Sequence, residues 1–294
     1  MMVDYGGIIS EALKKDAFST RSLPMIVVTV SAAICIYMIS MDFIFNFFLP
    51  FISHGIYRDI PAELLKDMLS FAIRIVVILL LFWILSLFAG GVIMKQAGEE
   101  CHFRECASFV MRKMLSMISA GILISFIPNV LSFGLSEVPY VGSLLSFAVF
   151  IFVELITFVV YPIIILDNSG AINAISSSIH HFFSHKLEVF IMWLLVAVIS
   201  LIILLIFSLP FIAYFIYLIF LLFSPGSHHR YHGDDMTYLI YDALVRTLPF
   251  LIVSTLILAV GIAVTTAFSY GVKARYYASV RESTSVKERT DEAQ

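Results

Sequence analysis

The sequence alternates long apolar runs with shorter polar segments. Six runs reach roughly 20 residues, the length a helix needs to cross the hydrocarbon core of a bilayer. They are residues 23–51, 69–94, 114–135, 142–166, 189–209 and 248–272. Because each backbone polar group inside a bilayer must be paired within its own segment, we expect these runs to be helices. The pattern predicts an all-α polytopic membrane protein, with residues 1–272 as a single integral membrane domain and residues 273–294 as a polar tail.

The fifth apolar run is too long for one crossing. Residues 189–223 contain almost no polar break, and at 1.5 Å per residue they would form roughly 50 Å of helix. Pro210 can interrupt this helix. Two arrangements are open: one crossing followed by a short segment over residues 211–223, or two short crossings and seven spans in all.

The placement of Lys and Arg favours six spans. With six spans, thirteen basic residues lie on the side that holds both termini, and four lie on the opposite side. Cytoplasmic loops carry an excess of Lys and Arg, so the richer side is predicted to be cytoplasmic. A seventh span would move the five basic residues of the tail outside. We therefore expect a multi-pass protein of the cell membrane with both termini in the cytoplasm.

The amino-acid composition limits the classes of partner that the protein can be expected to bind. Hydrophobic residues make up 61% of the chain and charged residues 13%, against about half and a quarter in soluble domains. The net charge is only −3, and the basic residues form no dense patch, so nucleic acid is excluded as a partner. Membrane lipids are the expected partners, with a protein partner or a second copy of the chain left open, and no cofactor is expected.

Amphipathic segments precede the first, third and fifth spans. Apolar residues recur at spacings of three and four over residues 8–17, 103–114 and 172–183. This spacing places them on one stripe of a helix, and such helices can lie in the membrane interface on the cytoplasmic side. The segments are either three ordinary connectors or parts of a threefold repeat, in which each unit is an interface helix followed by a transmembrane hairpin.

Ionisable groups inside spans are costly, so they are candidates for function. Asp42 and Arg74 are expected at similar depth, where an ion pair would join the first hairpin. Glu154 is expected near the bilayer midplane, level with Asn129, which follows Pro128 in the third span. Glu154 is either a structural hydrogen-bond donor, to Asn129 or to a carbonyl freed by Pro128, or an ion or proton site. No second charge near the midplane is expected beside it.

Two polar segments contain residue types that bind metals in other proteins. Cys101 and Cys106 share one loop, but zinc sites use tighter spacing and more ligands, so neither a metal nor a disulfide is expected there. His228 and His232 are four residues apart, with Asp234 nearby, and on a helix they could share a metal. Flanking glycines favour a loop instead, and we expect a solvated loop without a metal.

The stretch from Glu99 to Arg104, reading EECHFR, resembles the first motif of the glutamate-type intramembrane CAAX proteases. That resemblance implies a water-activating pair, Glu99 and Glu100, with histidines supplied by later helices. The third and fourth spans contain no histidine, so the partners of that pair are missing. An intramembrane hydrolase is therefore a minor alternative.

The stretch over residues 161–178 reads YPIIILDNSGAINAISSS. It resembles an element of the membrane domain associated with glycerophosphoryl diester phosphodiesterases and of its stand-alone archaeal relatives. The matching positions are Asp167, Gly170, Ala174 and Ser178. The resemblance implies a multi-pass fold and no catalytic residues, because the phosphodiesterase site belongs to a separate soluble barrel. From the residues themselves, Asp167 or Ser169 is expected to cap the helix that follows.

The leading hypothesis is a non-enzymatic membrane protein that organises lipid or partner proteins through its interface helices. It depends on the three amphipathic segments and on the lack of a complete catalytic set. The alternative from another class is a small-solute or ion transporter centred on Glu154.

Overall fold

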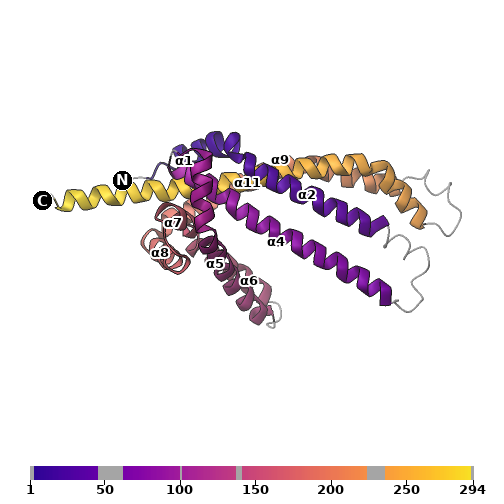
Figure 1. The fold of residues 1–294 in the computed structure, drawn as a ribbon, viewed down its shortest axis with the longest axis horizontal. Helices are drawn as coiled ribbons and strands as arrows, with labels where there is room; N and C mark the ends of the chain where they lie inside the picture. Colours follow the sequence, from indigo (N-terminus) through magenta and orange to yellow (C-terminus); the bar gives the residue numbers. More distant parts are fainter. Residues whose placement is uncertain (1–2, 46–61, 100, 137–140, 224–235, 293–294) are drawn as a thin grey trace. The chain divides into compact units, whose positions relative to one another are not determined.

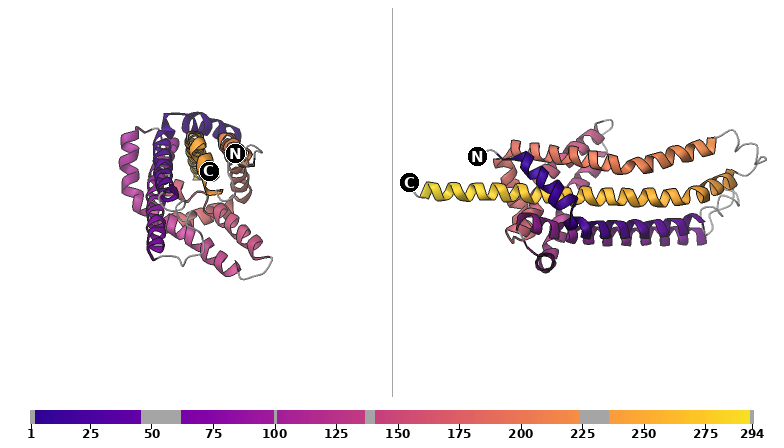
Figure 2. Two further views of the ribbon diagram at one scale, coloured as in Figure 1. Left: turned by 90° about the vertical axis from the view of Figure 1, so that its right-hand side faces the viewer. Right: turned by 90° about the horizontal axis from the view of Figure 1, so that it is seen from above.

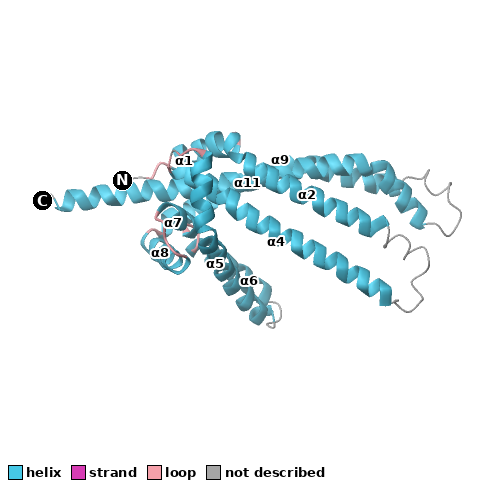
Figure 3. Ribbon diagram, viewed as in Figure 1, coloured by secondary structure: helices cyan, strands magenta, loops and turns pink. Residues whose placement is uncertain are grey.

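The computed structural model of this chain describes residues 3–45, 62–99, 101–136, 141–223 and 236–292. Every regular element in these ranges is a helix (Figure 3). Six helical stretches of the described chain are long and apolar enough to cross a membrane. They are Thr20–Phe43, Leu65–Gly98, Phe103–Leu135, Gly142–Leu166, Lys186–Leu221 and Val245–Ser283. The predicted all-α polytopic fold with six candidate spans is confirmed.

Four of the helices in Figure 1 extend beyond the apolar runs that predict them: α4, α5, α9 and α11. The bounds of the helices are α1 Tyr5–Glu11, the π-helix η1 Ala12–Ala17, the 3₁₀ helix η2 Thr20–Ser22, α2 Leu23–Phe43, α4 Ala62–Gly98, α5 Phe103–Ser136, α6 Gly142–Ile156, α7 Val160–Leu166, α8 Ala171–Ser184, α9 Lys186–Phe223 and α11 Met236–Glu292. Pro210 lies inside α9 without ending it, so residues 211–223 are not a separate segment. Loss of one backbone hydrogen bond at a proline does not end a helix of this length, and the six-span arrangement holds.

The chain forms two compact units. Unit 1 comprises Met1–Met25, Ser86–Leu201 and Val264–Gln294, and unit 2 comprises Ile26–Leu85 and Ile202–Ala263. Helices α2, α4, α9 and α11 contribute residues to both units. The chain that the sequence predicts as a single domain thus comprises two compact units.

Unit 1 is packed around glycines of α4. A Cβ on Gly91 would lie 2.7 Å from Val110 of α5, and one on Gly90 would overlap the ring of Tyr270 of α11. Small residues let helix backbones approach closely, which is how helices gain packing energy in a membrane. Ile93 and Phe268, which lie near these contacts in the chain, are fully buried.

The fourth candidate span is broken within unit 1. Helix α6 ends at Ile156, a turn follows, and α7 begins at Val160. The break leaves backbone carbonyls without partners inside the helix. Ser178 of α8 donates from its hydroxyl to the carbonyl of Ile156 over 2.8 Å, which satisfies one of them. Helix α8 is therefore fixed to the break.

The second predicted interface segment is not a separate helix. Helix α5 begins at Phe103 and runs unbroken to Ser136, so residues 103–114 are the first turns of the third span. No glycine or proline lies in this segment to end the helix. The first and third segments are separate, as α1 with η1 and as α8. The middle segment is therefore not a separate interface helix, and of the two alternatives the threefold repeat lacks its middle unit.

Unit 2 contains two described helix contacts. The rings of Phe43 in α2 and Phe71 in α4 stack with centroids 4.2 Å apart. Helices α9 and α11 run alongside each other (Figure 2), and the Cα of Gly261 lies so close to Phe207 that a side chain there would overlap its ring. The hydroxyls of Tyr214 and Thr247 lie 3.3 Å apart and are buried.

The residues predicted as a polar tail begin inside the packed part of unit 1. Helix α11 continues from the last span through Glu292. Ala274 and Tyr276 are fully buried. The sequence places the end of the span at residue 272 because charged residues follow, but two of them, Arg275 and Arg281, pair with Asp16 and Asp167 within the fold.

Candidate functional site

Helices α5 and α6 enclose a cleft of about 260 Å³. Its lining comprises Ile124, Ser125, Pro128, Asn129, Ser132, Phe150, Val153 and Glu154. Glu154 and Asn129, which the sequence predicts at the same depth, therefore face one cavity. Half of the lining side chains are apolar, and the polar ones come mainly from α5.

Glu154 accepts a hydrogen bond from α9, a helix that does not line the cleft. Trp193 of α9 donates from Nε1 to Oε2 of Glu154 over 2.9 Å. Asn129 instead donates from Nδ2 to the carbonyl of Ser125, one turn earlier in its own helix, over 2.6 Å. The predicted direct hydrogen bond between Glu154 and Asn129 is wrong because each side chain has a nearer partner.

Glu154 also has a cation in its electrostatic range. Lys273 of α11 interacts with the charge of Glu154, and its Nζ lies 5.2 Å from the ring centroid of Phe158. Lys273 is thus a charged neighbour of Glu154 that the prediction of no second midplane charge does not include. Sequence reasoning missed Lys273 because it assigned this residue to the tail, and the only available signal was its position directly after the last apolar run.

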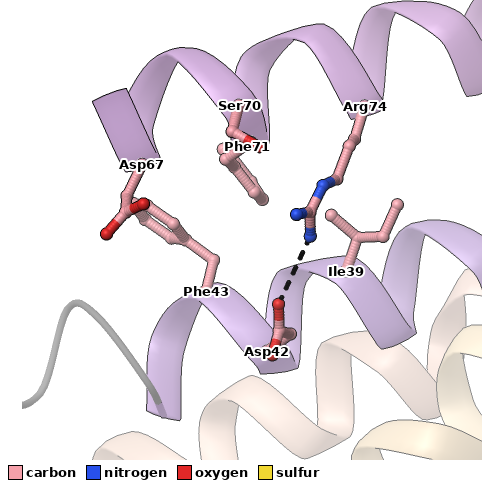
Figure 4. A pocket seen from close by; sticks show the side chains of 7 residues that line it. All are labelled: Ile39, Asp42, Phe43, Asp67, Ser70, Phe71 and Arg74. Carbon is pink, nitrogen blue, oxygen red and sulfur yellow. Dashed lines mark ion pairs between the residues drawn. The ribbon is translucent and has the colours of Figure 1, made fainter. Parts of the chain in front are cut away.

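Helices α2 and α4 form a second cleft, of about 190 Å³, in unit 2 (Figure 4). The predicted ion pair is present there: Arg74 of α4 reaches toward α2, and its Nη1 lies 3.5 Å from Oδ2 of Asp42. Both side chains are 56% exposed. Asp67 of α4 and the stacked rings of Phe43 and Phe71 complete the charged and aromatic lining.

Helix α8 has three distinct faces. Ala174, Ser178 and Phe182 recur every four residues, are buried, and pack against the rest of unit 1. A second face is polar and exposed, and it comprises Asn173, Ser176, Ser177, His180 and Ser184. A third face is apolar, with Ile172 75% and Phe183 53% exposed. Within the described chain, that third face is left uncovered.

The family-like element has structural partners. Asp167 accepts a hydrogen bond from the hydroxyl of Tyr277, and it lies 3.2 Å from Nη1 of Arg281. The N-cap of α8 is Gly170, and no side chain caps it, so the predicted cap by Asp167 or Ser169 is wrong. The carboxylate of Asp167 instead interacts with Tyr277 and Arg281 of α11. Ala174 is fully buried, and Ser178 bonds the α6 break.

A buried carboxylate anchors the N-terminal segment of unit 1. Asp16 of η1 is fully buried, and Nε of Arg275 donates to its Oδ2 over 2.8 Å. Arg21 donates from Nη1 to Oδ1 over 3.2 Å and to the carbonyl of Gln96 over 3.1 Å. Sequence reasoning missed this group because its members are far apart in the chain.

His181 lies on the packing side of α8 among other rings. Its ring centroid is 5.1 Å from that of His185 and 5.9 Å from that of Tyr276. Burial, and then the neighbouring His185 and His180, lower the pKa of His181 from its ordinary value of 6.5 to about 4. The imidazole is therefore neutral near pH 7.

Cys101 and Cys106 form a disulfide, which contradicts the expectation of free thiols. The first turn of α5 brings their Cα atoms to 6.2 Å, a separation that disulfides span. Glu99 pairs with Lys95 over 2.6 Å, whereas Glu100 and the loop residues His228, His232 and Asp234 lie outside the described residues. Within the described ranges, no three His, Cys, Asp or Glu side chains are placed to hold a metal ion.

The three comparisons with known proteins contribute no functional assignment. No family model, no curated protein and no solved structure matches this chain.

Proposed function

We propose that this polytopic membrane protein organises lipid at the membrane interface through the apolar face of α8, without catalysing a reaction. The observation that carries the proposal is the division of α8 into a packing face, a polar face and an uncovered apolar face. A helix that only packed against its own fold would bury its largest apolar residues. Here Phe182 is buried with the small residues Ala174 and Ser178, while Ile172 and Phe183 are 75% and 53% exposed.

The position of α8 in the chain supports an interfacial location. The helix follows the fourth candidate span, which ends at Leu166, and precedes the fifth, which begins at Lys186. It is therefore tethered at both ends beside the membrane surface. Moving a large apolar side chain from water into apolar surroundings contributes about 1.5–3 kcal/mol, so Ile172 and Phe183 together favour insertion into the interface.

The distribution of Lys and Arg supports one side of the membrane as the location of α8. Thirteen of the 18 Lys and Arg residues lie on the side of the termini and of α8, which supports a cytoplasmic location for this helix. The resemblance of residues 161–178 to a phosphodiesterase-associated membrane domain agrees with a non-catalytic role. Lipids are the proposed partners of the apolar face, and a protein partner is the alternative occupant.

The test uses the full chain reconstituted in phospholipid vesicles that contain a fluorescent probe of head-group order. The double variant Ile172→Ser with Phe183→Ser removes the apolar face, and Ser176→Ala with Ser177→Ala is the matched control on the polar face. Wild type and control should raise probe anisotropy equally, and the Ile172 and Phe183 variant should lose most of that rise. An equal rise in all three proteins, with unchanged helix content, would overturn the proposal.

A second candidate function is the movement of an ion or small solute at Glu154. The cleft that contains Glu154 and Asn129, together with the nearby cation Lys273, favours it. A carboxylate with a hydrogen-bond donor on one oxygen and a cavity beside it can bind and release a proton or cation. Uptake into vesicles that stays the same in Glu154→Gln, with Glu105→Gln as the exposed control on α5, would exclude this role.

A further inference from the structure

The Asp42–Arg74 ion pair faces away from its own unit. More than half of each side chain is exposed, although α2 and α4 are candidate membrane spans. Around the pair, exposed apolar side chains lie on both helices: Met38 on α2, and Leu69 and Ile73 on α4. The exposed Lys66 and Asp67 precede them on α4, so charged and lipid-compatible side chains meet at this surface.

Charges on such a surface require a polar partner. An ion pair that faces hydrocarbon loses its hydration, and its mutual attraction alone does not offset that loss. The guanidinium of Arg74 has five N–H donors, and a single carboxylate 3.5 Å away does not use them all. The cleft beside it, of about 190 Å³, is the space from which a further acceptor can reach Arg74.

The cleft is lined by an acidic and a basic side chain at separate positions along α4. Asp67 lies seven residues before Arg74 on α4, so both residues are on the same helix face, two turns apart. The carboxylate of Asp67 and the guanidinium of Arg74 therefore lie at different ends of the cleft. Between them, the stacked rings of Phe43 and Phe71 add the kind of surface that attracts organic cations (Figure 4).

We propose that this cleft binds the head group of a zwitterionic phospholipid, with the phosphate at Arg74 and the ammonium at Asp67. Guanidinium groups recognise phosphate through parallel hydrogen bonds, and carboxylates and aromatic rings recognise ammonium. The lining contains two carboxylates and one guanidinium, so a purely anionic head group meets net repulsion. The apolar neighbours Leu69 and Ile73 would contact the acyl chains, which favours a lipid over a free zwitterion.

The experiment is native mass spectrometry of the full chain in detergent, after incubation with phosphatidylethanolamine, phosphatidylglycerol or diacylglycerol. Wild type should retain phosphatidylethanolamine about tenfold better than phosphatidylglycerol, and diacylglycerol least. Arg74→Gln should lose retention of both phospholipids. Asp67→Asn should lower phosphatidylethanolamine to the level of phosphatidylglycerol. The control Arg112→Gln, an exposed arginine of α5, should behave as wild type.

Each other outcome counts against the proposal. Equal retention of the two phospholipids by wild type would show adventitious lipid only, and unchanged retention in Arg74→Gln and Asp67→Asn would place the lipid elsewhere. Displacement of the lipid by excess free phosphoethanolamine would show that a soluble zwitterion is the ligand. Arg74→Lys keeps the charge, so partial retention in this variant separates a binding role from a loss of folding.

Discussion

Arg275 holds the buried carboxylate of Asp16, with Nε of the guanidinium 2.8 Å from Oδ2. The two residues are 259 positions apart in the chain, so this pair joins the N-terminal helices of unit 1 to α11. Arg21 binds the other oxygen of the same carboxylate. Two cations around one buried anion form an anchor for the segment that enters the first span.

Removal of this anion should destabilise the protein. Asp16→Asn takes the buried carboxylate from Arg21 and leaves Arg275 its pair with Glu11, and breaking a buried pair costs about 3–5 kcal/mol. Glu99→Gln is the matched control, because Glu99 pairs with Lys95 near the surface, where a pair contributes about 1 kcal/mol or less. Thermal melting in detergent should show a clear loss for Asp16→Asn and almost none for Glu99→Gln. Equal melting temperatures would contradict this account of the anchor.

Gly271 should tolerate no side chain. A Cβ at this position would lie 2.6 Å from Oδ2 of Asp16 and 2.8 Å from its Cβ, so Gly271→Ala must displace the anchor. Gly134→Ala is the opposite case, because among the described residues its added Cβ meets no atom within 4 Å outside its own helix backbone and chain neighbours. Alanine also favours a helix interior by about 0.5–1 kcal/mol. Gly271→Ala should therefore melt earlier than wild type and Gly134→Ala no earlier. A Gly271→Ala protein as stable as wild type would show that Asp16 is not held against α11.

His181 should make the protein less stable in acid. Its pKa is about 4 in the fold and near 6.5 when unfolded, so the unfolded chain binds more protons between these values. The contribution of neutral His181 to the free energy of unfolding is complete above pH 6.5 and falls as the pH drops toward 4. Because the ring is partly exposed, its contribution is well below the roughly 3 kcal/mol that the full shift would imply.

The comparison that isolates His181 is a pH series of melting temperatures for wild type and two variants. His181→Phe should flatten the decline between pH 6.5 and pH 4, whereas the exposed His180→Gln should keep most of it. A decline in His181→Phe as steep as in wild type would assign the acid sensitivity to other groups.

The disulfide between Cys101 and Cys106 predicts a labelling pattern. Protein purified without reductant and then denatured should take up one maleimide, at Cys35, and three after reduction. Three labels without reduction would contradict the disulfide. Disulfides persist in oxidising compartments, whereas the distribution of Lys and Arg predicts a cytoplasmic location for this loop, so the same measurement on intact cells also tests the proposed orientation.

The spans could be predicted from the sequence, whereas several contacts of the candidate sites could not. Apolar runs locate the six spans because hydrocarbon demands long apolar helices. They do not locate helix ends, since α5 and α11 continue through charged turns, where Lys113, Arg275 and Arg281 bond to other segments. The Asp42–Arg74 pair was predictable because both residues interrupt neighbouring spans at one depth. Asp16 and Arg275 carry no such signal, because only the folded chain brings the two segments together.

The central claim is that the uncovered face of α8 lies in lipid, and spin labels on this helix test it most directly. Labels at Ile172 and Phe183 sample the apolar face, and labels at Asn173 and Ser177 sample the polar face, each in full-length protein in vesicles with the native cysteines replaced by serine. The account predicts that oxygen collides more often with the first two labels, and a water-soluble nickel chelate more often with the other two. Free access of the nickel chelate to all four labels would contradict it.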